Sequence, residues 1–294
     1  IQEGELVEEG RVGELSIGAA VEAFENGITG LSLNIVTGAY SYDRIFQELD
    51  DEDLSSGPDR SFDKLEYVTT NQTDLLGLNL RGGLSTQLTD MVRFGIVMET
   101  PTYYSASEVY SKEMRTYFDD GSLERAGGDD SDIASGEYDY NIRTPWRFGL
   151  GSSIQVSGLQ VAVDVSYVDW SQMRLDSKYD DYDDVNRDLR NNYSAIWPYR
   201  IGAEYRQGSL VVRAGYAVQQ YPRRDQERID RDRVYYAGGL GYTVSHDMDI
   251  EISWQHERFD DREVPYTDPE IQNLPTVTED ISRNFVTVGV KVRL

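Results

Sequence analysis

Apolar and polar residues alternate one by one along most of the chain, most clearly in residues 285–294. One face of this segment would carry Val286, Val288, Val290, Val292 and Leu294, and the other Thr287, Gly289, Lys291 and Arg293. A period of two predicts a β-strand, because successive side chains of a strand point to opposite faces. A strand with one wholly apolar face and one charged face needs an apolar environment on one side and a polar one on the other. Lipid outside and a polar lumen inside, as in an outer-membrane β-barrel, supply both.

The same alternation recurs in other segments. From Leu159 onward, Val161, Val163 and Val165 point one way, while Gln160 and Asp164 point the other. Helical spacing fits none of these windows. We predict an all-β protein, a transmembrane antiparallel barrel, with about eleven strands centred near residues 18, 33, 78, 95, 149, 163, 202, 213, 239, 252 and 289.

The connections between these strands alternate in length. Tight turns are predicted at residues 25–27, 88–90, 157–158, 207–208 and 246–247, and long acidic loops near 48–61, 118–135, 179–192, 222–232 and 260–280. Outer-membrane barrels have short turns on one rim and long loops on the external rim. A soluble sandwich would mix loop lengths at both ends and use shorter strands.

The predicted strand number is odd, whereas bacterial single-chain barrels usually have an even number. Residues 1–10 show neither the basic start nor the apolar core of a signal peptide. We therefore expect residues 1–294 to form a single barrel domain that is incomplete at its N-terminus and lacks an odd number of strands.

Composition narrows the function classes. The formal charge of −25 makes nucleic acid an improbable partner, because phosphate binding needs a basic face. The mean hydropathy of −0.56 argues against transmembrane helices. The 21 Tyr, 4 Trp and 8 Phe would supply the two aromatic girdles of a barrel. There is no cysteine, and hence no disulfide or thiolate metal site. The acidic, lysine-poor composition fits a high-salt habitat or simply acidic loops, and both interpretations stay open.

Several segments resemble the FadL/OmpP1/TodX family of outer-membrane hydrocarbon and fatty-acid channels, particularly its members from Bacteroidetes-like bacteria. The strongest likeness runs through residues 137–170, with Thr144-Pro145-Trp146-Arg147 and the strand pair joined at Gly158. Further similar segments are residues 31–42, 99–104 and 201–216. The resemblance covers nearly the whole chain through the order and spacing of these segments.

This resemblance implies a fourteen-stranded barrel whose lumen is plugged by a small N-terminal hatch. The strands predicted here would correspond to the last eleven, so the hatch and the first three strands would be absent. The family's hatch, its short motif and its laterally open third strand therefore have no counterpart among these residues.

The inward positions carry both signs of charge. The candidate lumen-lining residues are Arg81, Arg93, Arg147, Asp164, Arg200, Glu204, Arg213, Asp249 and Glu251. These side chains would line a permeation path, or they would simply be paired charges that a narrow lumen must neutralise, and the second interpretation is favoured. No residue can be assigned to substrate binding.

Other candidate sites have simpler explanations. Clusters at Asp50–Asp53, Asp129–Asp132 and Asp180–Asp184 have oxygen ligands for divalent cations but lack the spacing of a calcium loop, so solvated acidic loops are favoured and no metal site is predicted. His246 is placed in a turn, and His256 near Trp254 on the lipid side. No nucleophile elbow or metal-ligand pair is present, so neither an enzyme nor a cofactor is predicted.

Thr100-Pro101 and Thr144-Pro145 fall within predicted strands. Proline removes a ladder donor there and favours a bulge or a bend. The bend would form a side opening or, as we favour, a structural bulge near the external rim.

We expect passive transport of hydrophobic small molecules, such as long-chain fatty acids or hydrocarbons, across a bacterial outer membrane. The expected partners are outer-membrane lipid and the hydrophobic ligand, with other envelope proteins as a further option. The alternative is a structural or accessory barrel in a larger envelope complex. A soluble secreted β-protein would be excluded by one continuous apolar belt around the molecule.

Overall fold

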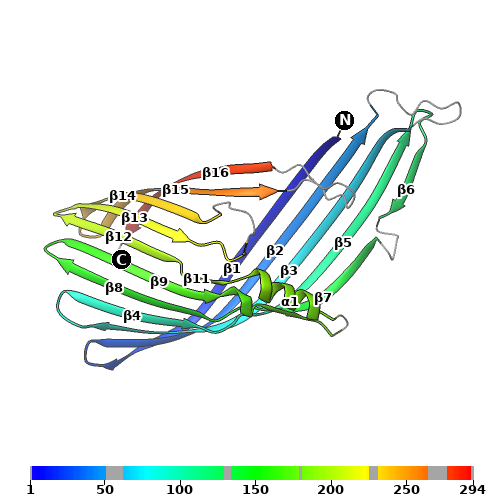
Figure 1. Ribbon diagram of the computed structural model, residues 1–294. Coiled ribbons are helices and arrows are strands. Elements are labelled where there is room, and N and C mark those ends of the chain that lie inside the picture. The colour runs from blue at the N-terminus through cyan, green and yellow to red at the C-terminus, as the bar shows by residue number, and fades with distance from the viewer. Residues whose placement is uncertain are drawn as a thin grey trace.

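The computed structural model describes residues 2–50, 62–128, 134–178, 181–224, 231–263 and 277–292. These residues form one antiparallel sheet (Figure 1). Its first half consists of β1 (Gln2–Phe24), β2 (Gly27–Leu49), β3 (Phe62–Gln87), β4 (Val92–Glu99), β5 (Tyr103–Phe118), β6 (Leu123–Gly127), β7 (Ser135–Arg143) and β8 (Arg147–Val156). Its second half consists of β9 (Leu159–Asp169), β10 (Arg174–Asp176), β11 (Ala195–Ile196), β12 (Tyr199–Gln207), β13 (Leu210–Gln219), β14 (Arg233–Ser245), β15 (Met248–Glu263) and β16 (Val277–Val292).

Several of these strands are pieces of longer, interrupted strands. The lower part of β3 pairs with β4 and its upper part with β5, so β4 and β5 are one strand interrupted at Pro101. In the same way β7 and β8 are interrupted at Pro145, and β11 continues into β12. When the short segments β6 and β10 are set aside, eleven long strands remain in the described chain, and each contains one predicted centre.

The five predicted tight turns are all present. They join β1 to β2, β3 to β4, β8 to β9, β12 to β13, and β14 to β15. Three contain left-handed residues: Asn26 has φ 62°, Gly158 φ 85° and Gly208 φ 57°, a region that Asn and Gly enter most readily. The long connections lie at the opposite ends of the strands, so the sheet has a turn rim and a loop rim.

The alternation of the sequence sorts side chains onto two faces of the sheet. Rows of paired residues such as Ile17–Leu33–Leu80 and Val212–Leu240–Ile252–Val288 run across the strands on the outer face. Asp164, Arg213 and Ser253 lie at the alternate positions, on the inner face. The outer-face side chains form an exposed apolar belt that includes Leu15, Leu33, Leu80, Leu150, Val163, Ile201, Leu240, Ile252 and Val288. This belt contradicts the soluble alternative.

An aromatic row edges the belt towards the loop rim. Trp146 stacks on Phe148 at 6.2 Å, and Tyr167 lies 4.7 Å from Trp197. Farther around the sheet the row comprises Tyr199, Tyr216, Tyr236, His256 and Trp254, with neighbouring ring centroids 5.4–6.3 Å apart. Aromatic girdles occupy the membrane interfaces of outer-membrane barrels, so this row marks the external interface.

Strands β1, β2, β3 and β5 continue far beyond this interface (Figure 1). β3 alone has 26 residues, whereas crossing the membrane takes about 9–11. On the outer face of these strands charged residues such as Arg11 and Asp74 replace the apolar ones above the belt. We call the part of β1, β2, β3, β5, β6 and β7 above this level the external extension.

One predicted loop contains a helix. Residues 179–192 were expected to form a solvated acidic loop, but α1 (Asp183–Asn192) occupies most of them. Asp183 and Asp184 in its first turn and Arg190 in its last turn suit the helix dipole. Asn186 docks the helix on β10, because its side chain both accepts from the Leu175 N–H (2.8 Å) and donates to the Leu175 carbonyl (2.7 Å).

The sheet is strongly curled but not closed. Within the described residues, β1 pairs with β2 alone and β16 with β15 alone. None of the helices among these residues has the length and apolar character to cross a membrane. The fourteen-strand total remains a prediction.

Candidate functional site

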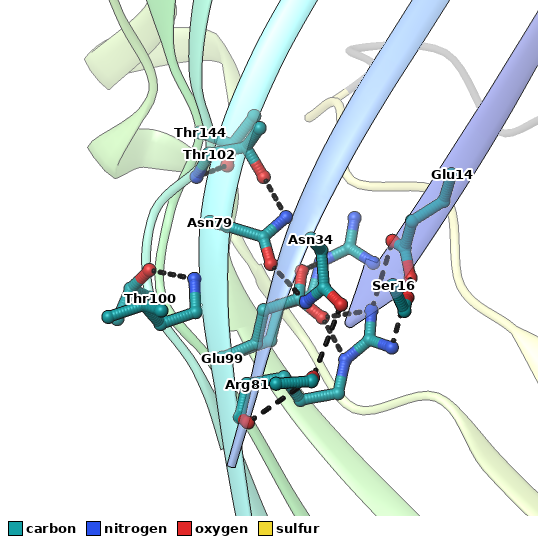
Figure 2. Close-up of polar contacts among 12 residues, drawn as sticks. Glu14, Ser16, Asn34, Asn79, Arg81, Glu99, Thr100, Thr102 and Thr144 are labelled. Atoms are coloured by element: carbon teal, nitrogen blue, oxygen red, sulfur yellow. Dashed lines mark hydrogen bonds and ion pairs between the residues drawn. The ribbon is translucent and has the colours of Figure 1, made fainter. Parts of the chain in front are cut away.

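The inner face carries a group of paired charges beside the interruption of the β4–β5 strand (Figure 2). Arg81 on β3 donates to Glu99 on β4 at 2.9 Å and to Glu14 on β1 at 3.3 Å. Arg147 on β8 lies 3.9 Å from the same Glu99. Two arginines and two carboxylates from four strands therefore neutralise each other on the inner face.

A second group lies on β12, β13 and β15. Arg213 donates to Glu204 at 2.8 Å and to Glu251 at 3.2 Å. It reaches Glu251 across β14, where Gly239 and Gly241 leave space: a Cβ on Gly241 would lie 3.7 Å from the Arg213 guanidinium. Arg213 thus bridges two strands that are not neighbours.

The other predicted lumen-lining residues are placed more loosely. Arg200 and Asp164 are 4.0 Å apart, at the limit of an ion pair. Arg93 makes no ion pair with a carboxylate of the described chain, and Asp249 accepts from Thr243 at 2.8 Å. At least seven of the nine predicted residues therefore take part in ion pairs. Such pairing suits a structural role as well as a permeation path, which remains a prediction.

A buried chain of amides and hydroxyls lies directly beside the first charge group (Figure 2). Asn34 donates to Asn79 at 2.7 Å, and Asn79 donates to Thr102 at 2.9 Å. All three are buried, with Asn34 completely so. Thr144 then accepts from the Thr102 N–H at 2.8 Å and its own N–H donates to the Thr102 carbonyl. We call these four residues the amide-hydroxyl chain.

Sequence reasoning missed Glu14 and the amide-hydroxyl chain. The period-two pattern places Glu14, Asn34 and Asn79 on the inner face, so that signal was available. The hydrogen bonds themselves depend on the registers of three strand pairs, which the sequence pattern leaves open.

The inner face of the curled sheet lines a continuous hollow that is open to one side. Two cavities of about 1080 and 1040 Å³ share part of their lining, including Arg81, Asp164 and Arg200. The cavity towards the turn rim is lined largely by small residues such as Gly83 and Gly151. The cavity towards the loop rim is lined by larger side chains. Ligand pockets usually measure about 300–1,000 Å³, so either part would accommodate a small hydrophobic molecule.

Towards the loop rim the hollow has an apolar lining with one unusual donor. Val168 and Ile196 are buried there beside Trp170. The indole N–H of Trp170 is buried and has no hydrogen-bond acceptor among the described residues. The guanidinium of Arg147 lies 5.8 Å from the Trp170 ring. Buried donors are normally satisfied, so a buried indole N–H without an acceptor is unusual.

Neither histidine forms a catalytic arrangement. His246 is exposed in its turn next to Asp247. His256 stacks on Trp254 at 5.9 Å, and both rings lie 3.1 Å from the Asn284 side-chain oxygen at the interface, as predicted for an interfacial histidine. Across the described residues no group of histidines and carboxylates is arranged to hold a metal ion. Residues 51–53 and 129–132 and Asp180 of the acidic clusters lie outside the described residues.

The family model described as outer membrane protein transport protein (OMPP1/FadL/TodX) matches residues 14–293. The chain belongs to this family. Its members are outer-membrane barrels of Gram-negative bacteria that transport hydrophobic compounds, so the chain is a transport protein rather than an enzyme, and its partners are membrane lipid and hydrophobic compounds. No curated protein matches the chain in sequence.

Solved structures of the family share the fold. The toluene transporter TbuX of Ralstonia pickettii is 17% identical, with a TM-score of 0.57 over 97% of this chain and 68% of that one. A FadL homologue of Pseudomonas aeruginosa is 15% identical, with a TM-score of 0.57 over 98% and 67%. A deltaS2S3 mutant of the monoaromatic hydrocarbon channel TodX is 17% identical, with a TM-score of 0.60 over 97% and 71%.

Proposed function

We propose that this FadL-family protein carries hydrophobic molecules with a hydrogen-bond-accepting head group, long-chain fatty acids foremost, passively across the outer membrane. The proposal rests on the loop-rim end of the hollow. Val168 and Ile196 provide an apolar surface there, and the Trp170 N–H and the Arg147 guanidinium provide donors beside it.

The Trp170 N–H is the reason for proposing a substrate with a hydrogen-bond-accepting head group. A buried donor without an acceptor costs about 1–3 kcal/mol, and a carboxylate oxygen would remove this cost. Arg147 would add charge to the same interaction, because its contact with Glu99 is long at 3.9 Å. A pure hydrocarbon would leave the N–H unsatisfied.

The route follows from the shape of the inner face. A ligand captured among the external loops would enter the hollow at Trp170 and pass Arg81, Asp164 and Arg200 towards the small-residue cavity. It would then leave sideways into the lipid. Diffusion down a gradient needs no nucleotide site.

Monoaromatic hydrocarbons are the second candidate substrates. Two of the similar structures are transporters of toluene or monoaromatic hydrocarbons, and the cavity nearer the turn rim would take a small ring against its small and apolar residues. An accessory role in a larger envelope complex, without transport, remains the alternative function.

The test is uptake by cells that lack their own hydrophobic-compound channel and express the full chain. We expect labelled oleate to accumulate faster than in cells without the chain. Trp170→Phe should raise the half-saturating oleate concentration about tenfold and leave toluene uptake unchanged, because the N–H donor is lost while a smaller aromatic ring is kept. Trp254→Phe is the matched control, since that indole lies on the outer face and donates to Asn284.

The other outcomes are also informative. Oleate uptake that is unaffected by Trp170→Phe would contradict the head-group contact. Uptake of toluene but not of oleate would favour the hydrocarbon candidate. A chain folded in the outer membrane that moves neither compound would favour the accessory role.

A further inference from the structure

A separate cavity lies on the outer face, where the β4–β5 and β7–β8 strands are interrupted. It has a volume of about 510 Å³, and Pro101, Thr144 and Trp146 form part of its lining. Because Trp146 stacks on Phe148 at one end of the aromatic row, the cavity lies at the height of the external lipid head groups. The charge groups of the inner face take no part in it.

Three arginines line this cavity: Arg143 from β7, Arg174 from β10 and Arg190 from α1. None of them makes an ion pair with a carboxylate of the described chain, although acidic residues outnumber basic ones 53 to 28. Arg143 contacts the ring of Tyr103 at 5.6 Å. On the inner face, by contrast, Arg81, Arg147 and Arg213 all have carboxylate partners. We call these three arginines, which line one cavity without a carboxylate partner in the described chain, the outer arginine cluster.

The fold brings two of the arginines together. Arg174 is the direct cross-strand partner of Arg143 in the β10–β7 pair. Like charges directly opposite each other on a strand pair are destabilising, and α1 adds a third guanidinium. An anion between the guanidinium groups would turn this repulsion into attraction.

Asp169, a carboxylate beside the cavity lining, is already engaged. Asp169 accepts from the Ser171 hydroxyl at 2.6 Å and from the Gln172 side chain at 3.2 Å, and both of these donors line the cavity. Ser171 and Gln172 therefore hold Asp169, while the outer arginine cluster remains available for a ligand. The guanidinium fork suits phosphate oxygens, which it contacts in pairs.

We propose that the outer arginine cluster binds the phosphate monoester of an anionic lipid in the external leaflet, with the acyl chains of that lipid lying on the apolar belt below Trp146. Phosphate charge at head-group height and hydrocarbon beneath it match the order of arginine, tryptophan and aliphatic side chains along β7 and β8. The site is independent of the proposed transport route, because it lies on the opposite face of the sheet.

The experiment uses the full chain in zwitterionic detergent micelles. Lipid A with two phosphates and lipid A without phosphate, with identical acyl chains, serve as probes in a binding titration. We expect the phosphorylated form to bind at least about tenfold more tightly, and the Arg143→Gln/Arg174→Gln variant to abolish most of that difference. Arg187→Gln is the matched control, because Arg187 lies on the same helix as Arg190 but pairs with Asp184 outside the cavity.

Folding can be checked in the same samples. Removing one or both opposed charges should leave the unfolding midpoint in phosphate-free micelles unchanged or raised, since repulsion is lost. Equal binding of the two lipids, or a preference that survives in the double variant, would overturn the proposal. Complete displacement of the lipid by millimolar inorganic phosphate would overturn the lipid assignment and indicate a site for free phosphate.

Discussion

The two halves of the sheet are built differently. From β12 to β16 the strands run without interruption, and their ladders are regular except for one register shift between Thr243 and Ser245, so the two faces follow the alternation of the sequence. Between β3 and β10 the strands are interrupted at Pro101 and Pro145, and side chains supply hydrogen bonds there. The uninterrupted half is stabilised mainly by lipid on one face and polar surroundings on the other. The interrupted half relies on a few specific hydrogen bonds.

The threonines beside the prolines supply these hydrogen bonds. Proline has no N–H, so Pro101 and Pro145 each remove a ladder donor. The threonine hydroxyls do not replace these donors but supply acceptors for backbone N–H groups of the adjacent strand: the Thr100 hydroxyl accepts from the Leu80 N–H at 3.0 Å, and the Thr144 hydroxyl from the Thr102 N–H at 2.8 Å. The favoured sequence interpretation, a structural bulge near the external rim, agrees with these contacts.

The largest effect is expected from charges placed on the outer face. Val163→Arg or Ile252→Arg should destabilise the folded protein in lipid by about 2–4 kcal/mol, because an arginine near the bilayer midplane loses its hydration. Gln160→Arg and Ser253→Arg, on the inner face of the same strands, should cost much less. Refolding titrations in lipid vesicles measure the difference, and equal costs on both faces would exclude the barrel assignment.

Breaking the amide-hydroxyl chain should be the next most costly change. Asn79→Leu leaves the Asn34 amide without an acceptor and Thr102 without a donor, both in buried surroundings, so we expect a loss of about 1–3 kcal/mol of unfolding free energy. Asn141→Leu, at an exposed amide, should stay within about 0.5 kcal/mol. Urea unfolding in lipid measures both, and similar values would mean that the chain contributes little.

The uninterrupted half of the molecule was largely predictable. The tight turns, the strand positions and the face that each side chain occupies followed from the alternation and from residues such as Gly208, because lipid imposes the pattern on every residue of the belt. The external position of His256 beside Trp254 followed in the same way.

The interrupted half was less predictable. Nothing in the local pattern indicates that Asn79 meets Thr102, since this depends on which strands become neighbours. The helix α1 was missed because its acidic segment has few apolar residues and is held by the Asn186 contacts with Leu175, which are tertiary. Likewise, Arg143 and Arg174 come together only through the pairing of β10 with β7.

Two glycines sharpen the account of the turns. Gly158 and Gly208 both have positive φ, but only at Gly158 would a Cβ meet backbone, 2.6 Å from the Arg206 carbonyl oxygen. Gly208→Ala should cost about 1 kcal/mol from backbone strain alone, and Gly158→Ala about 1 kcal/mol more. Thermal or urea midpoints in lipid decide this, and identical costs would contradict the predicted clash.

The smallest effect concerns the external extension. Lys64 donates to Glu66 at 2.8 Å and lowers the pKa of that carboxyl, to which Tyr117 also donates at 3.0 Å. A lowered pKa in the folded state means that this stabilisation is present above the ordinary Glu pKa of about 4.3 and is lost as pH falls through the folded value.

Hydrogen exchange at residues 62–69 and 112–118 should therefore increase below about pH 4 more than exchange in β12–β16. The Glu66→Gln variant should show a weaker increase, because its side chain does not titrate. An identical pH response in the variant would assign the effect to other carboxyls of the extension.

The most direct test of the two-solvent sheet is an accessibility scan with single spin-labelled cysteines in lipid vesicles, which the absence of native cysteine makes straightforward. Labels along residues 159–167 and 248–256 should alternate, with Val163 and Ile252 exposed to a lipid-soluble quencher and Asp164 and Ser253 to a water-soluble one. Along residues 98–104 the alternation should break at Pro101. A uniform response along all three segments would contradict the assignment of lipid to one face and a polar hollow to the other.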